Sequence, residues 1–257
     1  MGKIIAVTNQ KGGVGKTTTQ VNLAACIAQM GRRVLSVDMD PQGNATSGMG
    51  VTAENGRSIY DVLSGAVAAK ECLTKTMVDT LFLLPTDMRL AAAEVELVDS
   101  EGREYVLQQA LAPIRNDFDY IFIDCPPSLG LLTLNALCAA DRVLVPIQCE
   151  YYALEGVGQL MNTVQRVQRG LNPKLDVEGV VLTMLDGRTN LGLQVVQEVK
   201  RHFKQQVYAT IIPRNVRLSE APSFGQPIHL YDSRSMGAEA YMDLAKEFLR
   251  RSEGSSR

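Results

Sequence analysis

Seven short aliphatic runs, separated by stretches long enough to form helices, constrain the fold of this chain more than any other feature. The runs lie at residues 4–7, 34–37, 81–84, 120–123, 143–147, 180–182 and 209–212. They are continuous and do not alternate with polar residues, which is typical of strands covered on both faces. Strands that alternate with helices favour a parallel sheet with right-handed crossovers. The sequence therefore predicts an α/β fold, with a mostly parallel twisted sheet and helices on both faces.

The composition is that of one globular domain. The chain has 257 residues, of which 46% are hydrophobic and 21% are charged, an ordinary balance for a protein with a sizeable core. No repeat or linker interrupts residues 1–251, so we predict a single domain over that range. The polar stretch 252–257 is predicted to be a disordered tail.

The sequence predicts a cytoplasmic protein. The apolar run near the N-terminus is too short for a signal peptide, and no later run is long enough to cross a membrane. The five cysteines form no C-x-x-C pair. They are therefore expected to be reduced, buried thiols.

The first predicted strand leads into residues 9–19, NQKGGVGKTTT. The end of this stretch matches the phosphate-binding loop G-x-x-x-x-G-K-[ST], but Gln10 stands where the first glycine should be. Backbone N–H groups of such a loop and the N-terminus of the following helix attract phosphate. A plain glycine turn between strand and helix is the alternative. The predicted nucleotide-binding residues of the loop are Gly12, Gly13, Val14, Gly15, Lys16, Thr17 and Thr18.

Within this loop, Lys16 is predicted to contact the β- and γ-phosphates of a nucleotide, and the Thr17 hydroxyl to bind Mg²⁺. Residues 16–30 are predicted to form the helix that follows, which Gly31 ends. Lys11 is an additional lysine that the common motif lacks. One lysine suffices for the phosphates, so the loop itself leaves the role of Lys11 open.

Two aspartates, Asp38 and Asp40, follow the second predicted strand. Residues at i and i+2 of an extended chain project to the same side. In α/β proteins, ligands bind at the carboxyl ends of the strands. A single aspartate there is weak evidence, whereas this pair beside a phosphate-binding loop indicates a role with Mg²⁺ and water.

Asp124 ends the apolar strand at residues 120–123. This is the Walker-B arrangement, in which the carboxylate holds Mg²⁺ directly or through water. Asp124 could instead cap a helix that starts near Leu129. Ser128 suits that role better, which leaves Asp124 for the metal.

Taken together, K-G-G-V-G-K-T-T, D-M-D-P-Q and D-C-P-P resemble the motifs of the deviant-Walker ATPases of the ParA/MinD class. The sequence is most similar to the chromosome-partitioning ParA proteins, also called Soj. The resemblance extends from about residue 3 to 250 and includes residues 43–48, 187–191, 212–222 and 237–239. It implies a P-loop NTPase fold, ATP and Mg²⁺ as cofactors, and ATP hydrolysis that is weak until a partner stimulates it.

The resemblance also implies a role for Lys11. In this family the extra lysine reaches across a two-fold interface to the ATP of the other subunit, so that ATP holds a homodimer together. An interfacial charge of this kind resembles an arginine finger, and Gly12 lets the two loops approach closely. A solvated loop lysine is the alternative for Lys11.

Further roles are carried over from the family. Asp40 is expected to orient or activate the attacking water, and Asp38 to lie near Lys16 and the metal shell. The catalytic residues implied are thus Lys11, Lys16 and Asp40, and the metal-binding residues are Thr17, Asp38 and Asp124. Adenine is expected to lie against Met184, Pro213 and Asn215.

A basic segment indicates a DNA-binding face. Residues 186–218 contain six Lys or Arg and two acidic residues, a formal charge of +4. The whole chain carries −2, so the remainder carries −6. Such asymmetry fits contacts with a phosphate backbone, although a solvated charged surface would look the same. The resemblance implies that Arg188 and Arg217 bind DNA.

Other members of the class bind membranes, reduce substrates through an iron–sulfur cluster or act on metabolites. A membrane anchor would need a basic amphipathic C-terminal helix, but residues 238–251 place Glu239, Asp243 and Glu247 at helical spacing. Cys125 and Cys138 lack the glycine-rich surroundings of a cluster site, and fit buried packing better.

The main hypothesis is a nucleoid-associated partitioning switch. An ATP-dependent homodimer would bind double-stranded DNA without sequence preference. A ParB/Spo0J-like partner with a basic N-terminal peptide would stimulate hydrolysis and release, and no membrane would be involved. The alternatives are a MinD-like membrane-positioning ATPase and an ATP-dependent metabolic enzyme.

Overall fold

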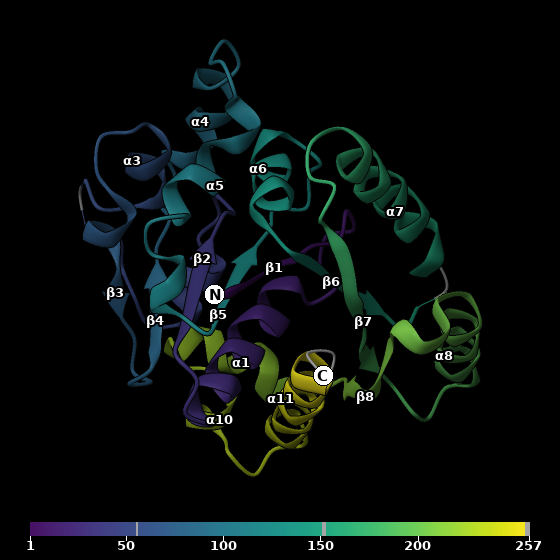
Figure 1. The fold of residues 1–257 in the computed structure, drawn as a ribbon. Helices are drawn as coiled ribbons and strands as arrows, with labels where there is room; N and C mark the ends of the chain where they lie inside the picture. The colour runs from purple at the N-terminus through teal and green to yellow at the C-terminus, as the bar shows by residue number, and fades with distance from the viewer. Residues whose placement is uncertain (55, 151–152, 255–257) are drawn as a thin grey trace.

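The computed structural model describes residues 1–54, 56–150 and 153–254. This part of the chain is built around one eight-stranded sheet in the order β3-β4-β2-β5-β1-β6-β7-β8 (Figure 1). Every neighbouring pair is parallel except β3 and β4. The strands are β1 Lys3–Val7, β2 Val34–Asp38, β3 Thr74–Lys75, β4 Leu81–Leu84, β5 Tyr120–Asp124, β6 Arg142–Gln148, β7 Asp176–Leu185 and β8 Val207–Pro213.

All seven aliphatic runs are strands, so the predicted fold class is confirmed. The sequence analysis missed β3, the antiparallel edge strand. This strand has only two residues, Thr74 and Lys75, and neither is apolar. An edge strand of this kind is formed by pairing with its neighbour and leaves no hydrophobic pattern in the sequence.

Helices cover both faces of the sheet (Figure 1). They are α1 Lys16–Gln29, α2 Asn44–Gly48, α3 Ile59–Leu63, α4 Leu90–Glu96, α5 Val106–Leu111, α6 Leu131–Ala139, α7 Ala153–Gly170, α8 Asn190–Phe203, α9 Val216–Glu220, α10 Ile228–Tyr231 and α11 Met236–Gly254. The predicted first helix is α1. It ends just before Gly31, whose φ of 82° is left-handed, a conformation that glycine adopts readily.

The two faces of the sheet form two hydrophobic cores. In β1, Ile4 and Ala6 belong to the core under α3 to α8, whereas Ile5 and Val7 belong to the core under α1, α10 and α11. All four side chains are buried. Because successive strand residues point to opposite faces, a strand buried on both faces must be apolar throughout.

The C-terminal helix continues past the boundary that we predicted. Helix α11 runs to Gly254, so the prediction of disorder from residue 252 is wrong for residues 252–254. Ser252 accepts a hydrogen bond from Lys3 Nζ at 3.1 Å, and Glu253 forms an ion pair with Arg32. These contacts with distant residues hold the last turn. The rest of the predicted tail, residues 255–257, lies outside the described residues.

Candidate functional site

Three neighbouring strands bring the predicted site residues to one edge of the sheet. In the pairing register, Asp38 at the end of β2 lies opposite Asp124 at the end of β5, and Asp124 lies opposite Val7 at the end of β1. The glycine loop begins directly after β1. The loop and both aspartate motifs therefore meet at the carboxyl edge of the sheet, as the sequence predicted.

Two side chains, those of Asn9 and Thr183, hold the glycine loop in place. Asn9 accepts a hydrogen bond from the Lys11 N–H at 3.1 Å and donates one to the Pro146 carbonyl at 2.7 Å. The Thr183 hydroxyl donates to the Val14 carbonyl at 2.8 Å. Gly13 and Gly15 have φ of 73° and 84°, the left-handed region that glycine enters readily. The loop is thus a built structure with its shape set by β6 and β7.

The start of α1 is suited to an anion. Gly15 is its N-cap residue and makes no side-chain capping hydrogen bond, and the first turn contains no acidic residue. The first backbone N–H groups of a helix have no partner within the helix and carry partial positive charge. A loop of this form binds phosphate groups, which favours the nucleotide interpretation over a plain turn.

Lys16 lies inside this loop. The residue is 7% exposed, and its Nζ donates a hydrogen bond to the Lys11 carbonyl at 3.2 Å. Burial lowers the pKa of the Lys16 ammonium, while the charges of Asp124 and Asp40 act in the opposite direction. A largely desolvated ammonium at the mouth of an anion-binding loop is well placed to hold a phosphate group.

The Asp124 carboxylate is completely buried and only partly satisfied. Its Oδ2 accepts a hydrogen bond from the Thr17 hydroxyl at 2.7 Å. Its Oδ1 has no hydrogen-bond partner among the described residues. Burial, together with the nearby charge of Asp38, raises the pKa of Asp124 well above its ordinary value. A cation beside this carboxylate would offset both costs.

Thr17 and Asp124 form a donor set that fits Mg²⁺. Both present oxygen ligands, which Mg²⁺ prefers. Within the described ranges, no group of three or more His, Cys, Asp or Glu is arranged to hold a metal. This also suits Mg²⁺, because the ion usually keeps several waters and shares nucleotide oxygens instead of filling an all-protein cage.

Asp38 holds the segment that carries Asp40. Its Oδ2 accepts hydrogen bonds from the Thr46 N–H at 2.8 Å and the Thr46 hydroxyl at 2.7 Å, and its Oδ1 accepts one from the Asp40 N–H at 3.2 Å. Burial raises the pKa of Asp38 to about 6. The sequence analysis missed Thr46 because nothing local links it to the strand end. The proposed place of Asp38 in the metal shell stays a prediction.

Asp40 lies at the same edge, with 7% of its surface exposed. Its Oδ1 accepts a hydrogen bond from the Gln42 N–H at 3.0 Å, so the side chain closes a short turn. The second carboxylate oxygen is available for another contact. The negative charge of Asp40 also acts on Lys16, where it partly opposes the lowering of the Lys16 pKa by burial. The Asp40 carboxylate is therefore close enough to the phosphate-binding loop to influence it electrostatically.

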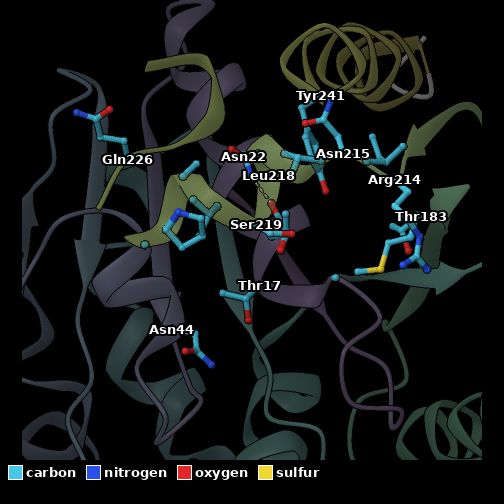
Figure 2. A pocket seen from close by; sticks show the side chains of 18 of the residues that line it. Thr17, Asn22, Asn44, Thr183, Arg214, Asn215, Leu218, Ser219, Gln226 and Tyr241 are labelled. Atoms are coloured by element: carbon cyan, nitrogen blue, oxygen red, sulfur yellow. Dashed lines mark hydrogen bonds between the residues drawn. The ribbon is translucent and has the colours of Figure 1, made fainter. Parts of the chain in front are cut away.

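A pocket of about 400 Å³ adjoins the loop (Figure 2). Its lining joins α1 to the ends of β7 and β8, and includes the predicted Gly15, Thr17, Thr18, Met184, Pro213 and Asn215. Sequence reasoning missed Asn22, Asn44, Leu218, Ser219 and Gln226, which come from segments without a nucleotide-binding motif. The volume falls in the usual range for small-ligand pockets.

Met184 has an unusual backbone conformation in this pocket. Its φ is 54°, in the left-handed region that bulky residues rarely enter. Its Cε lies 3.6 Å from the position that a Cβ on Gly15 would take. Strained residues persist where the surroundings enforce them, and they cluster at functional sites. Met184 thus packs directly against the phosphate-binding loop, at the place expected for a wall of the nucleoside pocket.

The helix after Asp124 starts later than expected. Helix α6 begins at Leu131 with Gly130 as its N-cap, so the prediction that Ser128 caps a helix starting near Leu129 is wrong. The Ser128 carbonyl instead accepts a hydrogen bond from the Thr133 hydroxyl at 2.6 Å. Asp124 is not the capping residue either.

Arg188 and Arg217 are both exposed, with 88% and 54% of their side chains accessible. Arg188 lies in the turn between β7 and α8, and Arg217 lies in α9. The segments that follow β7 and β8 run side by side at their start, because the Arg214 N–H donates to the Leu185 carbonyl at 3.0 Å. Arg188 pairs with Asp186 at 2.7 Å. Arg217 pairs with Glu220 at 2.8 Å and contacts Asp232 at 3.5 Å.

These ion pairs correct the charge count made from the sequence. Arg214 pairs with Glu150 at 3.2 Å. Glu150, Glu220 and Asp232 all lie outside the segment 186–218, so they neutralise part of its formal charge. The field at this surface is therefore weaker than +4 suggests. Exposed pairs are weak, however, and the arginines can exchange their carboxylate partners for phosphate groups.

The acidic pattern of α11 is also corrected. Glu247 does not face solvent: it is 6% exposed and accepts hydrogen bonds from the Ala209 N–H at 2.8 Å and the Thr210 N–H at 2.9 Å. These contacts fasten α11 to β8. Among the described residues, no helix combines the length and the apolar character needed to cross a membrane. All five cysteines are free and buried, as predicted.

Comparisons with known proteins agree with this site. A family model described as an AAA domain matches residues 2–177. The chain is 61% identical to the sporulation initiation inhibitor protein Soj of Bacillus subtilis, over 96% of this chain and 98% of that protein. It is 56% identical to the chromosome partitioning protein ParA of Myxococcus xanthus, over 98% of this chain and 89% of that protein.

Among solved structures, the cobyrinic acid a,c-diamide synthase of Mycobacterium smegmatis with bound ADP and magnesium is similar. Its TM-score is 0.87 and its sequence is 41% identical, over 99% of this chain and 97% of that one. A second structure of that protein, with a bound ATP analogue and magnesium, matches equally well. The fold is therefore shared with a protein that has been solved with bound ADP or an ATP analogue and magnesium.

Proposed function

Because the chain belongs to the ParA/Soj family of chromosome-partitioning ATPases, we propose that it is an ATP-dependent switch whose nucleotide-bound dimer binds DNA. The predicted family and the ATPase activity are confirmed, and ATP and Mg²⁺ are its cofactors. The partitioning role follows from the relatives. The dimer, the DNA contacts, the partner and the individual residue roles form our proposal.

Each residue of the site has a distinct task in this proposal. The backbone N–H groups of residues 12–17 and the ammonium of Lys16 hold the phosphates. Thr17 and Asp124 hold Mg²⁺, which neutralises phosphate charge when bound. Asp40 orients the attacking water through its second carboxylate oxygen, and Asp38 keeps Asp40 in position. Asn22, Met184, Pro213 and Asn215 border the nucleoside.

The open tip of the loop is the observation on which the dimer proposal rests. Gly12 and Gly13 are exposed, and Lys11 is half-buried. A Cβ on Gly12 would meet no atom within 4 Å. No contact among the described residues explains a glycine at this position. An approaching second molecule does, because it needs room at the tip, and Lys11 then reaches the phosphates held by the other subunit.

Replacing Lys11 by alanine is therefore expected to preserve ATP binding and abolish ATP-dependent dimerisation. The Lys11 backbone stays in the loop, so the carbonyl that accepts from Lys16 is retained. Only the charge that acts on the other subunit's nucleotide is lost. Light scattering with ATP should detect monomers. A normal proportion of dimers would show that Lys11 acts only within its own subunit, or not at all.

Gly12→Val tests the same interface without removing a charge. The space around Gly12 is open, so the variant should fold and bind ATP as a monomer. The added side chain should hold the two loops apart and prevent dimers. Isothermal titration with ATP and light scattering would measure the two properties separately. Stable ATP-dependent dimers of this variant would exclude close approach of the loops.

For DNA, we propose that the exposed guanidinium groups of Arg188 and Arg217 contact phosphate groups. One subunit offers only a small, partly neutralised basic surface. Dimerisation doubles that surface, and so links ATP binding to DNA binding. Phosphate contacts position a protein without reading bases, so binding should not depend on sequence. Association with the nucleoid follows from this proposal.

Arg188→Ala and Arg217→Ala are each expected to weaken DNA binding while leaving ATP binding and dimerisation intact. Each variant removes two arginines per dimer. If both contact phosphate, the slope of log K against log salt concentration should become shallower by roughly 2 units, at about 0.9 per contact. Filter retention of unrelated duplexes over a salt series would measure it. Lys246→Ala, an exposed lysine on α11, is the control.

Release is proposed to follow from stimulated hydrolysis by a ParB/Spo0J-like protein with a basic N-terminal peptide. No membrane is involved in this scheme. The C-terminal helix supports that choice, because α11 is fastened to β8 through Glu247 and lacks the basic face of an anchor. The MinD-like alternative predicts co-sedimentation with liposomes in the presence of ATP.

An ATP-dependent metabolic enzyme is the other candidate, since the similar Mycobacterium smegmatis structure bears the name of a synthase. The Soj and ParA proteins are more similar in sequence, which favours partitioning. DNA retention measured with ATP and with ADP tests the proposal most directly. We expect retention with ATP only. Equal retention with ADP would break the link between nucleotide and DNA, and a modified small-molecule product would favour the enzyme.

A further inference from the structure

Helix α4 carries an apolar face that the described part of the chain leaves uncovered. Met88, Val95 and Val98 are 85%, 76% and 48% exposed, and Ala91 and Ala92 between them are exposed as well. We call these five residues the α4 face: Ala91, Ala92 and Val95 lie on the helix, and Met88 and Val98 lie in the turns that flank it. Figure 1 shows α4 at the periphery, far from the C-terminal helix. Apolar faces of this kind commonly mark interaction sites.

The α4 face belongs to a firmly mounted element. On the opposite side, Leu90, Ala93 and Leu97 are buried in the core. Just before the helix, Arg89 pairs with Asp61 at 2.8 Å and with Asp87 at 2.7 Å. The outer face is thus presented by a helix held in place from behind, and its exposure is not a consequence of fraying.

Acidic residues surround the α4 face. The exposed acids Glu96, Asp99 and Glu101 lie within or just after the helix, and residues 90–102 contain no lysine or arginine. The charge of Arg89 is matched by Asp61 and Asp87. Arg103 donates to the Val98 carbonyl, and its charge is matched by Glu104. An apolar stripe bordered by negative charge is complementary to a helix that has an apolar stripe bordered by positive charge.

We propose that the α4 face docks a basic amphipathic helix of a protein partner. This inference rests on the partner-stimulated hydrolysis proposed above, and adds the surface on which the partner binds. A second copy of this chain is a poorer occupant, because two α4 faces would bring like charges together. A basic helix buries the exposed side chains and also neutralises the acids around them.

The location of α4 connects such a partner to the ATP site. Glu94 Oε1 accepts a hydrogen bond from the Leu132 N–H, at a long 3.5 Å, in the first turn of α6. A Cβ on Gly130 would overlap the same carboxylate oxygen, so a side chain at this position would displace the Glu94 carboxylate. The segment from Asp124 leads directly into α6. A helix bound on α4 therefore lies one contact away from the segment that follows the metal ligand.

The probe is a fluorescent peptide of leucine and lysine, about 18 residues long so that it can form a helix, with leucines at helical spacing. Wild-type protein should bind it in the presence of ATP, more weakly at high salt. Val95→Asp should lower the affinity roughly tenfold or more, because it removes a valine that the bound peptide would bury and adds a negative charge to the interface. Met236→Asp, at an exposed methionine elsewhere, should leave the affinity unchanged.

Two further variants separate charge from coupling. Asp99→Lys combined with Glu101→Lys should weaken binding and its salt dependence, whereas Asp243→Lys on α11 should not. Glu94→Ala should keep peptide affinity within about twofold, as expected for a change outside the contact. It should nevertheless remove the peptide's effect on the rate of ATP hydrolysis. Unchanged stimulation in this variant would overturn the coupling through α6.

Equal peptide affinity of Val95→Asp and the wild type, with both folded by circular dichroism, would overturn the docking surface. Light scattering provides a second test, of whether another copy of this chain occupies the α4 face. If the peptide-free wild type self-associates and Val95→Asp is monomeric, a second copy is the occupant and the proposal is wrong. DNA retention with ATP is measured on the same preparations. Its loss in the wild type would refute the proposed function, while the peptide data would still decide the α4 face.

Discussion

Replacing Lys16 by alanine is expected to lower the affinity for ATP by roughly 100-fold or more, since losing one partner of a desolvated charge pair costs several kcal/mol. Lys16 is largely buried, and its ammonium lies within the loop that is proposed to hold the phosphates. Backbone N–H groups remain in the variant, but they carry only partial charges. Isothermal titration with ATP and Mg²⁺ would measure the loss.

Lys11→Ala is the matched control, because it removes a lysine from the same loop and is expected to keep ATP binding. Alanine is a good helix former, so Lys16→Ala should preserve α1, and circular dichroism would verify this. Tight ATP binding by the Lys16 variant would mean that the loop is not the phosphate site. Loss of ATP binding in both variants would instead place Lys11 on the nucleotide of its own subunit.

Replacing Asp40 by alanine is expected to slow ATP hydrolysis by roughly 10²–10⁴-fold, the usual contribution of a group that activates or orients a reacting water. The proposed Mg²⁺ and phosphate ligands, Thr17, Asp124 and Lys16, all remain. ATP should therefore still bind, and the protein should accumulate as the ATP dimer. Single-turnover kinetics would give the rate, and light scattering the assembly state.

Asp40→Asn separates chemistry from structure. The Asp40 carboxylate also accepts the Gln42 N–H and closes a turn, and an asparagine side-chain oxygen can keep that bond. If Asp40 acts on water as a charged group, both variants should be slow. If asparagine restores the wild-type rate, the role of Asp40 is to hold the turn, and another residue must orient the water.

Part of the site could be predicted because the required pattern is short and local. The loop needs glycines where φ is positive, a lysine and a hydroxyl, all within one stretch after a strand. Asp124 could be predicted because it ends an apolar strand. By contrast, Thr46 and Asn22 reach the site through turns and helices whose sequences carry no such signature. Their places depend on how separate segments pack.

The charged surfaces show the same limit. Counting residues 186–218 gave a formal charge of +4, but the count could not include Glu150 and Asp232, which folding brings to the same surface. In α11, helical spacing put Glu247 in one acidic row with Glu239 and Asp243, whereas in the structure its carboxylate accepts hydrogen bonds from backbone N–H groups of β8. Sequence distance is a poor guide to electrostatics, because charges interact through space.

The sequence by itself determined the strands, the fold class and the phosphate-binding loop. Burial on both faces requires continuous apolar runs, and a left-handed loop requires glycine. Only the tertiary structure decided the order of the strands, the edge strand β3, the pocket beside Met184 and the exposure of the α4 face. These features depend on contacts between residues far apart in the chain. Such contacts close long loops, so they form only as the rest of the fold brings the two residues together.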